Sequence, residues 1–196
     1  MIWCFILFHI LSCQEQVLHT SDTHLKFDIV LKEKVVGQLH ATKSFKDAKA
    51  HYQSSTNITT RFIKDITVNY KYNVIFNTNT LEKADVHITV NNKPHAETKT
   101  QWLDNRYLIQ KNEDKAVVFN KAINYSTILM YFVEPENVSF CFSEEDGSIN
   151  TIIPLGNHTY KKINAKGKEN IYYYKNGKLI KAEIDGGLIS FQMLAK

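Results

Sequence analysis

The stretch Ile66-Thr-Val-Asn-Tyr-Lys-Tyr-Asn-Val-Ile-Phe76 decides the fold class, because an apolar or aromatic residue fills every second position. Successive side chains of a β-strand point to opposite faces, so this period of two predicts a strand with one buried face. The whole region from Ala50 to Asn77 is rich in Thr, Ile, Tyr, Val and Phe, which favour strands. The sequence therefore predicts one long strand here.

The same alternation recurs on both sides of this stretch, separated by turn residues. Before it, 25–31 and 36–42 alternate around the charged Lys32-Glu33-Lys34 and predict a hairpin. After it, Asn77-Thr-Asn-Thr80 and Asn91-Asn-Lys-Pro94 enclose another alternating segment, 84–90. Further strands are predicted at 97–102, 107–111, 116–119, 138–142, 149–153, 159–163, 169–175, 179–184 and 188–194.

One segment departs from this pattern. Residues 126–134 are continuously apolar in their centre, begin at Ser126 and end before Pro135, which predicts a short helix near 126–134 with Ser126 as its cap. About ten to twelve short strands with no repeated helix between them exclude a parallel α/β sheet. The sequence predicts an all-β, mainly antiparallel fold: a strongly curved sheet or barrel-like meander, with the helix against its concave face or mouth.

The composition describes a folded globular domain. Of 196 residues, 43% are hydrophobic and 22% are charged, with only 7 Gly and 3 Pro, which excludes disordered, collagen-like and low-complexity chains. The net charge of +4 is dispersed, with Lys161-Lys162 and Lys166-Gly-Lys168 as its densest part, so nucleic acid is not a predicted partner. We expect these lysines to keep a sheet edge soluble.

The first thirteen residues, MIWCFILFHILSC, predict export. Their apolar run has the length of a signal-peptide core and is too short to span a bilayer, although no Lys or Arg precedes Lys26. Ile10-Leu-Ser-Cys13 resembles a lipobox, in which Cys13 would be acylated; ordinary cleavage near Cys13 is the alternative. The sequence thus predicts a signal peptide (1–13), a linker (14–24) and a single β domain (25–196) without a transmembrane span, in the periplasm or at the outer membrane.

The sequence contains no motif for catalysis, metal binding or cofactor binding. Its histidines form no H-E-x-x-H arrangement and lie near no Cys pair, and neither G-x-S-x-G nor a Gly-rich phosphate loop occurs. We therefore predict no cofactor, no metal site and no catalytic residue. Cys141, between Phe140 and Phe142, is expected to be a buried small hydrophobe.

Acidic residues are densest between positions 134 and 146, namely Glu134, Glu136, Glu144, Glu145 and Asp146. Paired carboxylates act as acid and base in glycoside hydrolysis, so these residues carry a hydrolase hypothesis. Glu144-Glu-Asp-Gly147 is more typical of a solvated turn before the strand near Ile149. The enzyme hypothesis is therefore the least favoured.

Aromatic residues are the most informative part of the composition, with 10 Tyr and 11 Phe. In the run Tyr172-Tyr-Tyr174, the first and third side chains share one face of a strand. We predict that Tyr125, Tyr160, Tyr172 and Tyr174 line or rim a cavity that binds a ligand. The alternative is that these rings only fill the core.

Four stretches carry a family resemblance: Phe27 to Gly37, Tyr125 to Pro135, Leu155 to Tyr160 and Tyr172 to Leu188. Together they resemble an uncharacterised family of exported proteins from Bacteroidota, catalogued as a domain of unknown function. The resemblance covers most of the chain from Leu25 onward. It implies an antiparallel β domain with a short helix in the cell envelope, and it brings no known substrate, cofactor or catalytic residue.

Three functions follow from these observations. The favoured one is a non-enzymatic envelope protein whose curved sheet binds a lipid or another apolar or amphipathic small molecule, because a sheet of many strands can enclose a cavity. The alternative is a structural or interaction module that presents a strand edge or loop to another envelope protein. A hydrolase that uses the acidic segment is the third.

Overall fold

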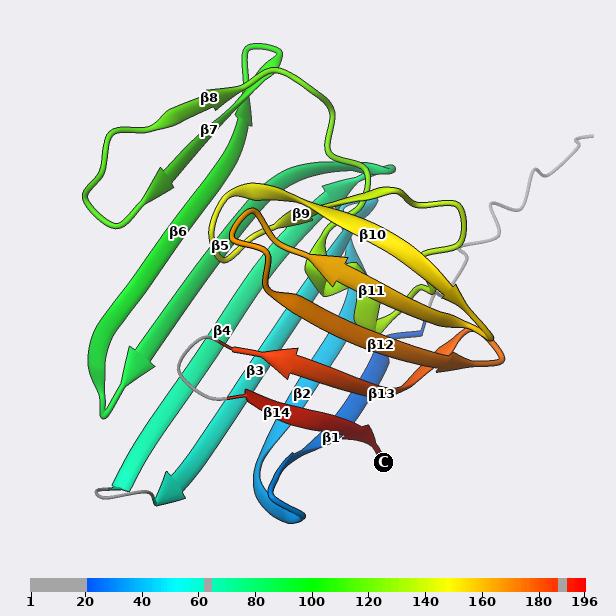
Figure 1. Ribbon diagram of the computed structural model, residues 1–196. Coiled ribbons are helices and arrows are strands. Elements are labelled where there is room, and N and C mark those ends of the chain that lie inside the picture. The colour runs from blue at the N-terminus through cyan, green and yellow to red at the C-terminus, as the bar shows by residue number, and fades with distance from the viewer. Residues whose placement is uncertain (1–20, 62–64, 187–189) are drawn as a thin grey trace, which may run out of the picture.

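The computed structural model describes residues 21–61, 65–186 and 190–196 (Figure 1). The predicted signal peptide with Cys13, most of the predicted linker and Leu188 lie outside the described residues. Within these ranges, one sheet of 14 strands and one short 3-10 helix make up the regular structure. The elements are β1 (Thr23–Leu31), β2 (Lys34–Lys46), β3 (Lys49–Arg61), β4 (Asp65–Asn77), β5 (Thr80–Val90), β6 (Lys93–Leu103), β7 (Arg106–Lys111), β8 (Val117–Phe119), η1 (Thr127–Tyr131), β9 (Phe140–Ser143), β10 (Ser148–Gly156), β11 (Thr159–Ile163), β12 (Glu169–Lys175), β13 (Lys178–Asp185) and β14 (Ser190–Ala195).

The sheet is two antiparallel meanders joined edge to edge. Strands β1 to β8 follow one another in space as in sequence, and so do β9 to β14. The two meanders meet where β1 pairs with β14, with Phe27 opposite Ala195 and Val30 opposite Gln192. Strands β8 and β9 are the two outer ends, so the sheet is curved and not closed. The predicted all-β, antiparallel and strongly curved fold is confirmed.

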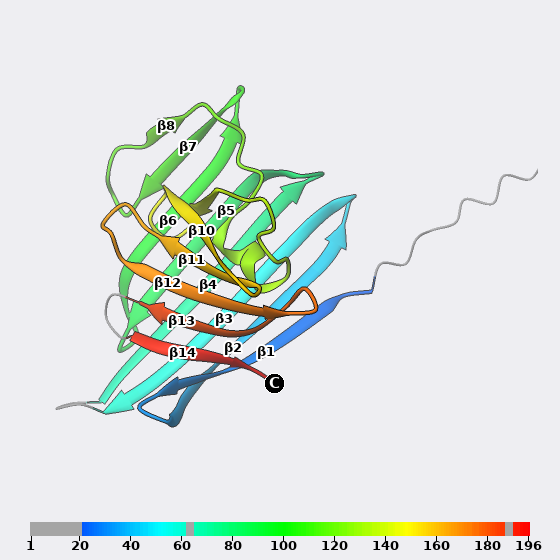
Figure 2. The same cartoon turned by 45° about the vertical axis from the view of Figure 1, so that its right-hand side comes forward.

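The curvature brings the two meanders over one another. Figures 1 and 2 both show β10 to β13 crossing in front of β2 to β5 at a steep angle, with η1 lying between the two layers. Among the described residues, no helix is long and apolar enough to cross a membrane.

The region from Ala50 to Asn77 corrects one prediction, because it holds two strands instead of one. Strands β3 and β4 pair with each other along their whole length, from Lys49 opposite Asn77 to Arg61 opposite Asp65. The sequence between Arg61 and Asp65 is Phe-Ile-Lys, which contains none of the Gly, Pro or Asn residues that mark a turn. The length of the segment is the better signal, because its 28 residues far exceed the usual strand length of up to about ten residues.

The predicted helix is shorter than expected and is held by a different residue. It spans Thr127–Tyr131 as a 3-10 helix, and Ser126 makes no side-chain cap hydrogen bond. The carboxylate of Glu144 accepts hydrogen bonds from the backbone N–H of Thr127 at 3.1 Å and of Ile128 at 3.0 Å. Glu144 is fully buried, so the prediction of a solvated turn is wrong for this residue. An unpaired N–H inside the fold costs free energy, and the buried acid avoids this cost for both N–H groups.

Two apolar clusters form the core of the part of the chain that the structure describes. One lies between β1 to β5 and the β9 to β14 meander, and it includes Phe27, Met130 and Tyr172. The other lies under β3 to β7 and the chain from Ile123 to Leu129. Cys141 belongs to the first cluster and is completely buried, as predicted, and burial raises the pKa of its thiol to about 12. The connection between β8 and β9 thus supplies core residues to both clusters.

Candidate ligand site between the two meanders

A cavity of about 230 Å³ lies where the two meanders cross. Strands β2, β3 and β4 supply Leu39, Thr56, Tyr70 and Tyr72 from one side. The opposite side and the mouth consist of Lys111, Thr127, Tyr131, Ser143, Glu145, Asp146, Asn150, Lys162, Asn164, Lys166, Lys168, Asn170, Tyr172, Ile184, Asp185, Gly186, Phe191 and Met193. The wall is therefore mixed, with aromatic and aliphatic side chains beside amides and charged groups.

Tyrosines from both meanders form much of the wall. Burial raises the pKa of Tyr70 to about 12, and the nearby charge of Glu145 adds to the shift. Burial likewise raises the pKa of Tyr172. The hydroxyl of Tyr72 donates to Glu145 Oε2 at 3.2 Å. These phenols stay protonated at neutral pH, so they offer hydroxyl groups beside flat apolar rings.

Lys162 on β11 projects into the interior. Lys162 is only 7% exposed, and its Nζ donates to Thr127 Oγ1 at 3.3 Å. Burial raises the pKa of the nearby Glu144, and the positive charge of Lys162 acts in the opposite direction. The prediction that this lysine keeps a sheet edge soluble is wrong, because β11 lies between β10 and β12 and is not an edge strand.

Asn150 on β10 is a second buried polar group of the wall. The residue is 1% exposed, and its Oδ1 accepts a hydrogen bond from Ser148 Oγ at 3.3 Å. Its Nδ2 is buried without a hydrogen-bond partner in the part of the chain that the structure describes. Buried donors are seldom left unpaired, because each costs free energy. The cavity wall therefore includes a side chain with an unpaired buried donor.

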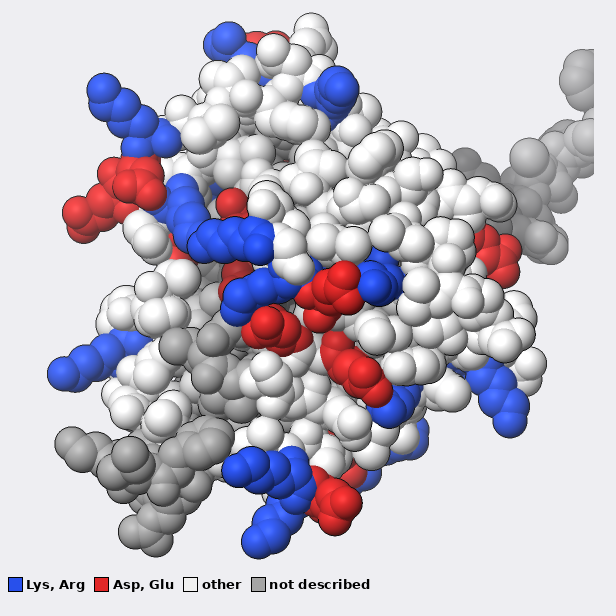
Figure 3. All heavy atoms as spheres, in the orientation of Figure 1, with Lys and Arg blue, Asp and Glu red and all other residues white. Residues whose placement is uncertain are grey.

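Charged residues gather at the mouth of the cavity. The turn between β11 and β12 is fixed by Asn164, whose Oδ1 accepts from the N–H of Lys166 at 2.9 Å and of Lys168 at 3.0 Å. Lys168 Nζ lies 3.2 Å from Asp185 Oδ1. Figure 3 shows basic and acidic side chains close together near the middle of the face seen in Figure 1. A molecule entering here would pass charged groups before it reached the aromatic wall.

The structure does not bring the four predicted tyrosines into one cavity. Tyr172 lines the cavity, whereas Tyr125 and Tyr174 bind the chain around η1, donating to the backbone oxygens of Val133 and Met130 at 2.6 Å each. The hydroxyl of Tyr160 donates to Oε1 of the buried Glu134, which follows η1, at 2.8 Å. The predicted ligand role for all four stays a prediction, and the contacts of three of them hold the fold together.

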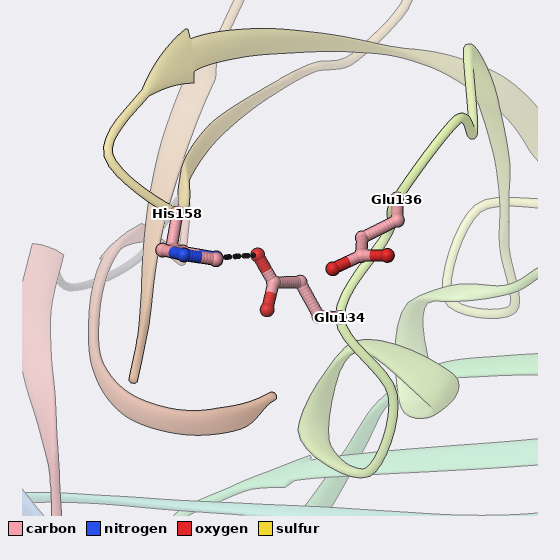
Figure 4. Close-up of side chains that lie close together, drawn as sticks. All are labelled: Glu134, Glu136 and His158. Atoms are coloured by element: carbon pink, nitrogen blue, oxygen red, sulfur yellow. Dashed lines mark hydrogen bonds and ion pairs between the residues drawn. The ribbon is translucent and has the colours of Figure 1, made fainter. Parts of the chain in front are cut away.

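The predicted acidic group is also divided among several places. Glu145 and Asp146 line the cavity, and Glu144 binds the start of η1. Glu134 and Glu136 lie instead beside His158, on the turn between β10 and β11 (Figure 4). Sequence reasoning missed this last group because His158 is 24 positions from Glu134. Only the pairing of β10 with β11 and the path of the chain after η1 bring them together.

Comparisons with known proteins agree with the fold and leave the activity open. A search of curated proteins finds no match. The crystal structure of a beta-barrel-like protein of domain of unknown function DUF1849 from Brucella abortus is similar, with a TM-score of 0.56 and 10% sequence identity over 88% of this chain and 95% of that one. At this identity the likeness concerns the fold alone. Residues 27–196 match the family described as domain of unknown function DUF6134, and the chain belongs to that family.

Proposed function

We propose that this protein binds a small amphipathic molecule with an anionic or strongly hydrogen-bond-accepting end in the cavity between its two meanders. The observation that carries the proposal is the pair of buried donors on the cavity wall, Lys162 Nζ and Asn150 Nδ2, the second of which has no partner among the described residues. Buried donors in a concave site bind acceptor groups, and the surrounding rings bind apolar atoms.

The size of the cavity limits the ligand. Ligand sites commonly have volumes of about 300 to 1,000 Å³. At about 230 Å³, this cavity favours a short chain or a single ring over a complete membrane lipid. Lys111 and Lys166 at the mouth would attract an anion from solution.

Octanoate and octanol form a suitable pair of probes, because they share a chain and differ in the charged end. We expect chemical shift changes in cavity residues on titration with octanoate, and weaker binding of octanol. Lys162→Met should weaken octanoate binding by about tenfold, the loss expected for one charged hydrogen bond. Lys181→Met is the matched control, because Lys181 lies over the Tyr173 ring and lines no part of the cavity.

The identity of the natural ligand needs protein from its own cells. Native mass spectrometry of such protein should show a bound small molecule that is lost in both Lys162→Met and Asn150→Asp, since the latter adds a like charge beside an anion. Repeated absence of any bound mass, together with no response to octanoate, would show that the cavity is not a ligand site.

We further propose that the protein is exported to the cell envelope and belongs to the Bacteroidota. The support for export is the apolar run before Gln14 and the lipobox-like Ile10-Leu-Ser-Cys13. The source in the Bacteroidota rests on the family resemblance alone. Cys13→Ala separates the two processing routes. Release of the protein from membranes would identify Cys13 as a lipid anchor, whereas unchanged fractionation would favour ordinary cleavage.

An interaction module is the second candidate, favoured by apolar side chains on β9 and β10. Phe140 is 63% exposed, and Leu155 and Ile153 are 49% and 38% exposed. Exposed apolar groups of this size mark contact surfaces when they lie together. In-cell crosslinking from position 151, which is exposed and pairs with Phe140, should capture a specific protein if this surface binds one, and Phe140→Ser should abolish the crosslink.

A further inference from the structure

Three side chains with metal-ligating atoms meet beside the turn between β10 and β11 (Figure 4). Glu134 and Glu136 come from the chain after η1, and His158 comes from the turn. One ligand atom from each lies within 4.8 Å of the others, and His158 Nδ1 is 2.8 Å from Glu134 Oε1. The residues lie outside the cavity described above.

The buried carboxylate of Glu134 is the central feature of this group. Its side chain is 4% exposed, and its Oε1 accepts hydrogen bonds from Tyr160 and from His158 at 2.8 Å each. Its Oε2 is buried and has no hydrogen-bond partner in the described part of the chain. Figure 4 shows this carboxylate between His158 and Glu136. A buried carboxylate oxygen without a partner costs free energy, which a cation would offset.

A simple ion pair does not account for the third residue. The imidazole of His158 already contacts Glu134, yet the carboxylate of Glu136 lies beside the same group and adds a second negative charge. Like charges at short distance repel unless a cation separates them. The arrangement of two carboxylates and one imidazole is therefore better explained by a bound ion than by an ion pair alone.

The distances are compatible with one ion. Zinc binds nitrogen and oxygen ligands at about 2.0 to 2.2 Å, so two ligand atoms on the same ion lie at most about 4.4 Å apart. The side chain of His158 is 60% exposed and Glu136 is exposed. Small rotations of these two side chains would therefore bring all three atoms onto an ion beside Glu134.

We propose that Glu134, Glu136 and His158 bind a divalent transition-metal ion, and that Zn²⁺ suits their donor set best. An imidazole nitrogen favours Zn²⁺ over Ca²⁺ and Mg²⁺, which take oxygen ligands. Tyr160 is the orienting partner of Glu134, as its hydroxyl holds Oε1 in place. The ion would fasten the chain after η1 to the turn between β10 and β11.

Calorimetric titration of the chelator-treated full chain with Zn²⁺ tests the site. We expect saturable binding of one ion per chain in the wild type. His158→Ala and Glu136→Gln should each weaken it at least about tenfold, since even groups that only orient metal ligands contribute that much. Both side chains are exposed, so both variants should fold.

The matched control is another histidine and glutamate pair, His87 and Glu97, which face each other across β5 and β6 and are both exposed. His87→Ala and Glu97→Gln should leave Zn²⁺ binding unchanged. Thermal unfolding gives an independent readout: Zn²⁺ should raise the Tm of the wild type and not that of His158→Ala. The site is disproved by absence of saturable binding, by equal affinity in His158→Ala, or by tighter binding of Ca²⁺ or Mg²⁺ than of Zn²⁺.

Discussion

The meander from β2 to β5 and the chain from Ile123 to Gly147 reach order by different means. In the meander, alternate residues such as Val68, Val74 and Phe76 are buried, and neighbouring strands satisfy each other's backbone groups. Most of the backbone of residues 123–147 has no neighbouring strand. Buried polar side chains therefore pair with part of its N–H and C=O groups. Glu144 binds two N–H groups, while Tyr125 and Tyr174 bind two carbonyls.

This difference decides where function can lie. Side chains of the meander pack on one face, where Leu39, Thr56, Tyr70 and Tyr72 also reach the cavity, and contact solvent on the other. Residues 123–147 instead bring charged and polar groups into the interior, and they contribute Thr127, Ser143 and Glu145 to the cavity. They also supply Glu134 and Glu136 to the proposed metal site. Buried polar groups are costly unless paired, so their concentration here is the physical sign of a site.

The largest expected effect comes from removing the buried acid of this segment. Glu144→Ala would leave the N–H groups of Thr127 and Ile128 unpaired and Lys162 without its neighbouring carboxylate. We expect a loss of about 3 to 5 kcal/mol in the free energy of unfolding, as for other broken buried networks. Urea unfolding measures it, with Glu113→Ala as the control because Glu113 is exposed. Equal midpoints for the two variants would contradict this role of Glu144.

The next largest effect concerns the meander, where the close approach of two strand backbones limits which side chains fit. A Cβ at Gly37 on β2 would overlap the carbonyl oxygen of Asn57 on β3. Because that oxygen belongs to a paired strand and cannot move aside, Gly37→Ala should cost about 2 to 3 kcal/mol. Gly177→Asn is the control: its turn has open space around the position, and Asn tolerates its φ of +72°. If both variants unfold at the same urea concentration, the close approach of β2 and β3 at Gly37 does not determine the stability of the protein.

The same comparison explains which features could be predicted from the sequence. Alternation between Ile66 and Phe76 predicts the strand and its buried face, because burial on one face forces a period of two. Nothing comparable marks Lys162 or Glu144, since a charged residue in a strand or turn normally faces water. The pairing of β10 with β11 likewise brings His158 to its position beside Glu134, and the local sequence does not predict that pairing. The places of the interior polar groups could therefore be found only from the structure.

The pH dependence of the free energy of unfolding further distinguishes the segment 123–147 from the meander. Burial raises the pKa of Glu144 above its ordinary value of 4.5. The folded protein then holds a proton that the unfolded chain releases, so stability from this group is complete below pH 4.5 and is lost as pH rises to the folded pKa. One group changes the free energy of unfolding by at most about 1.4 kcal/mol per pH unit.

Glu144→Gln is neutral at every pH and should lack this dependence. Urea unfolding of wild type and variant from pH 4.5 upward should show the wild type losing stability relative to Glu144→Gln. Parallel stability curves for the two proteins would mean that Glu144 titrates alike in the folded and unfolded states, and would contradict the burial argument.

The smallest effect tests a single hydrogen bond between a strand and the irregular segment. Tyr174→Phe keeps the ring that packs against Tyr160 and removes the hydroxyl that binds the carbonyl of Met130 at 2.6 Å. One buried hydrogen bond contributes about 1 kcal/mol, so the global loss should be of that order. Hydrogen exchange should accelerate at η1 amides and stay unchanged in β3 and β4, because the lost bond anchors the irregular segment alone. Tyr173→Phe, on the opposite face of β12, should alter neither region; uniform acceleration in Tyr174→Phe would instead show that the two regions unfold as one unit.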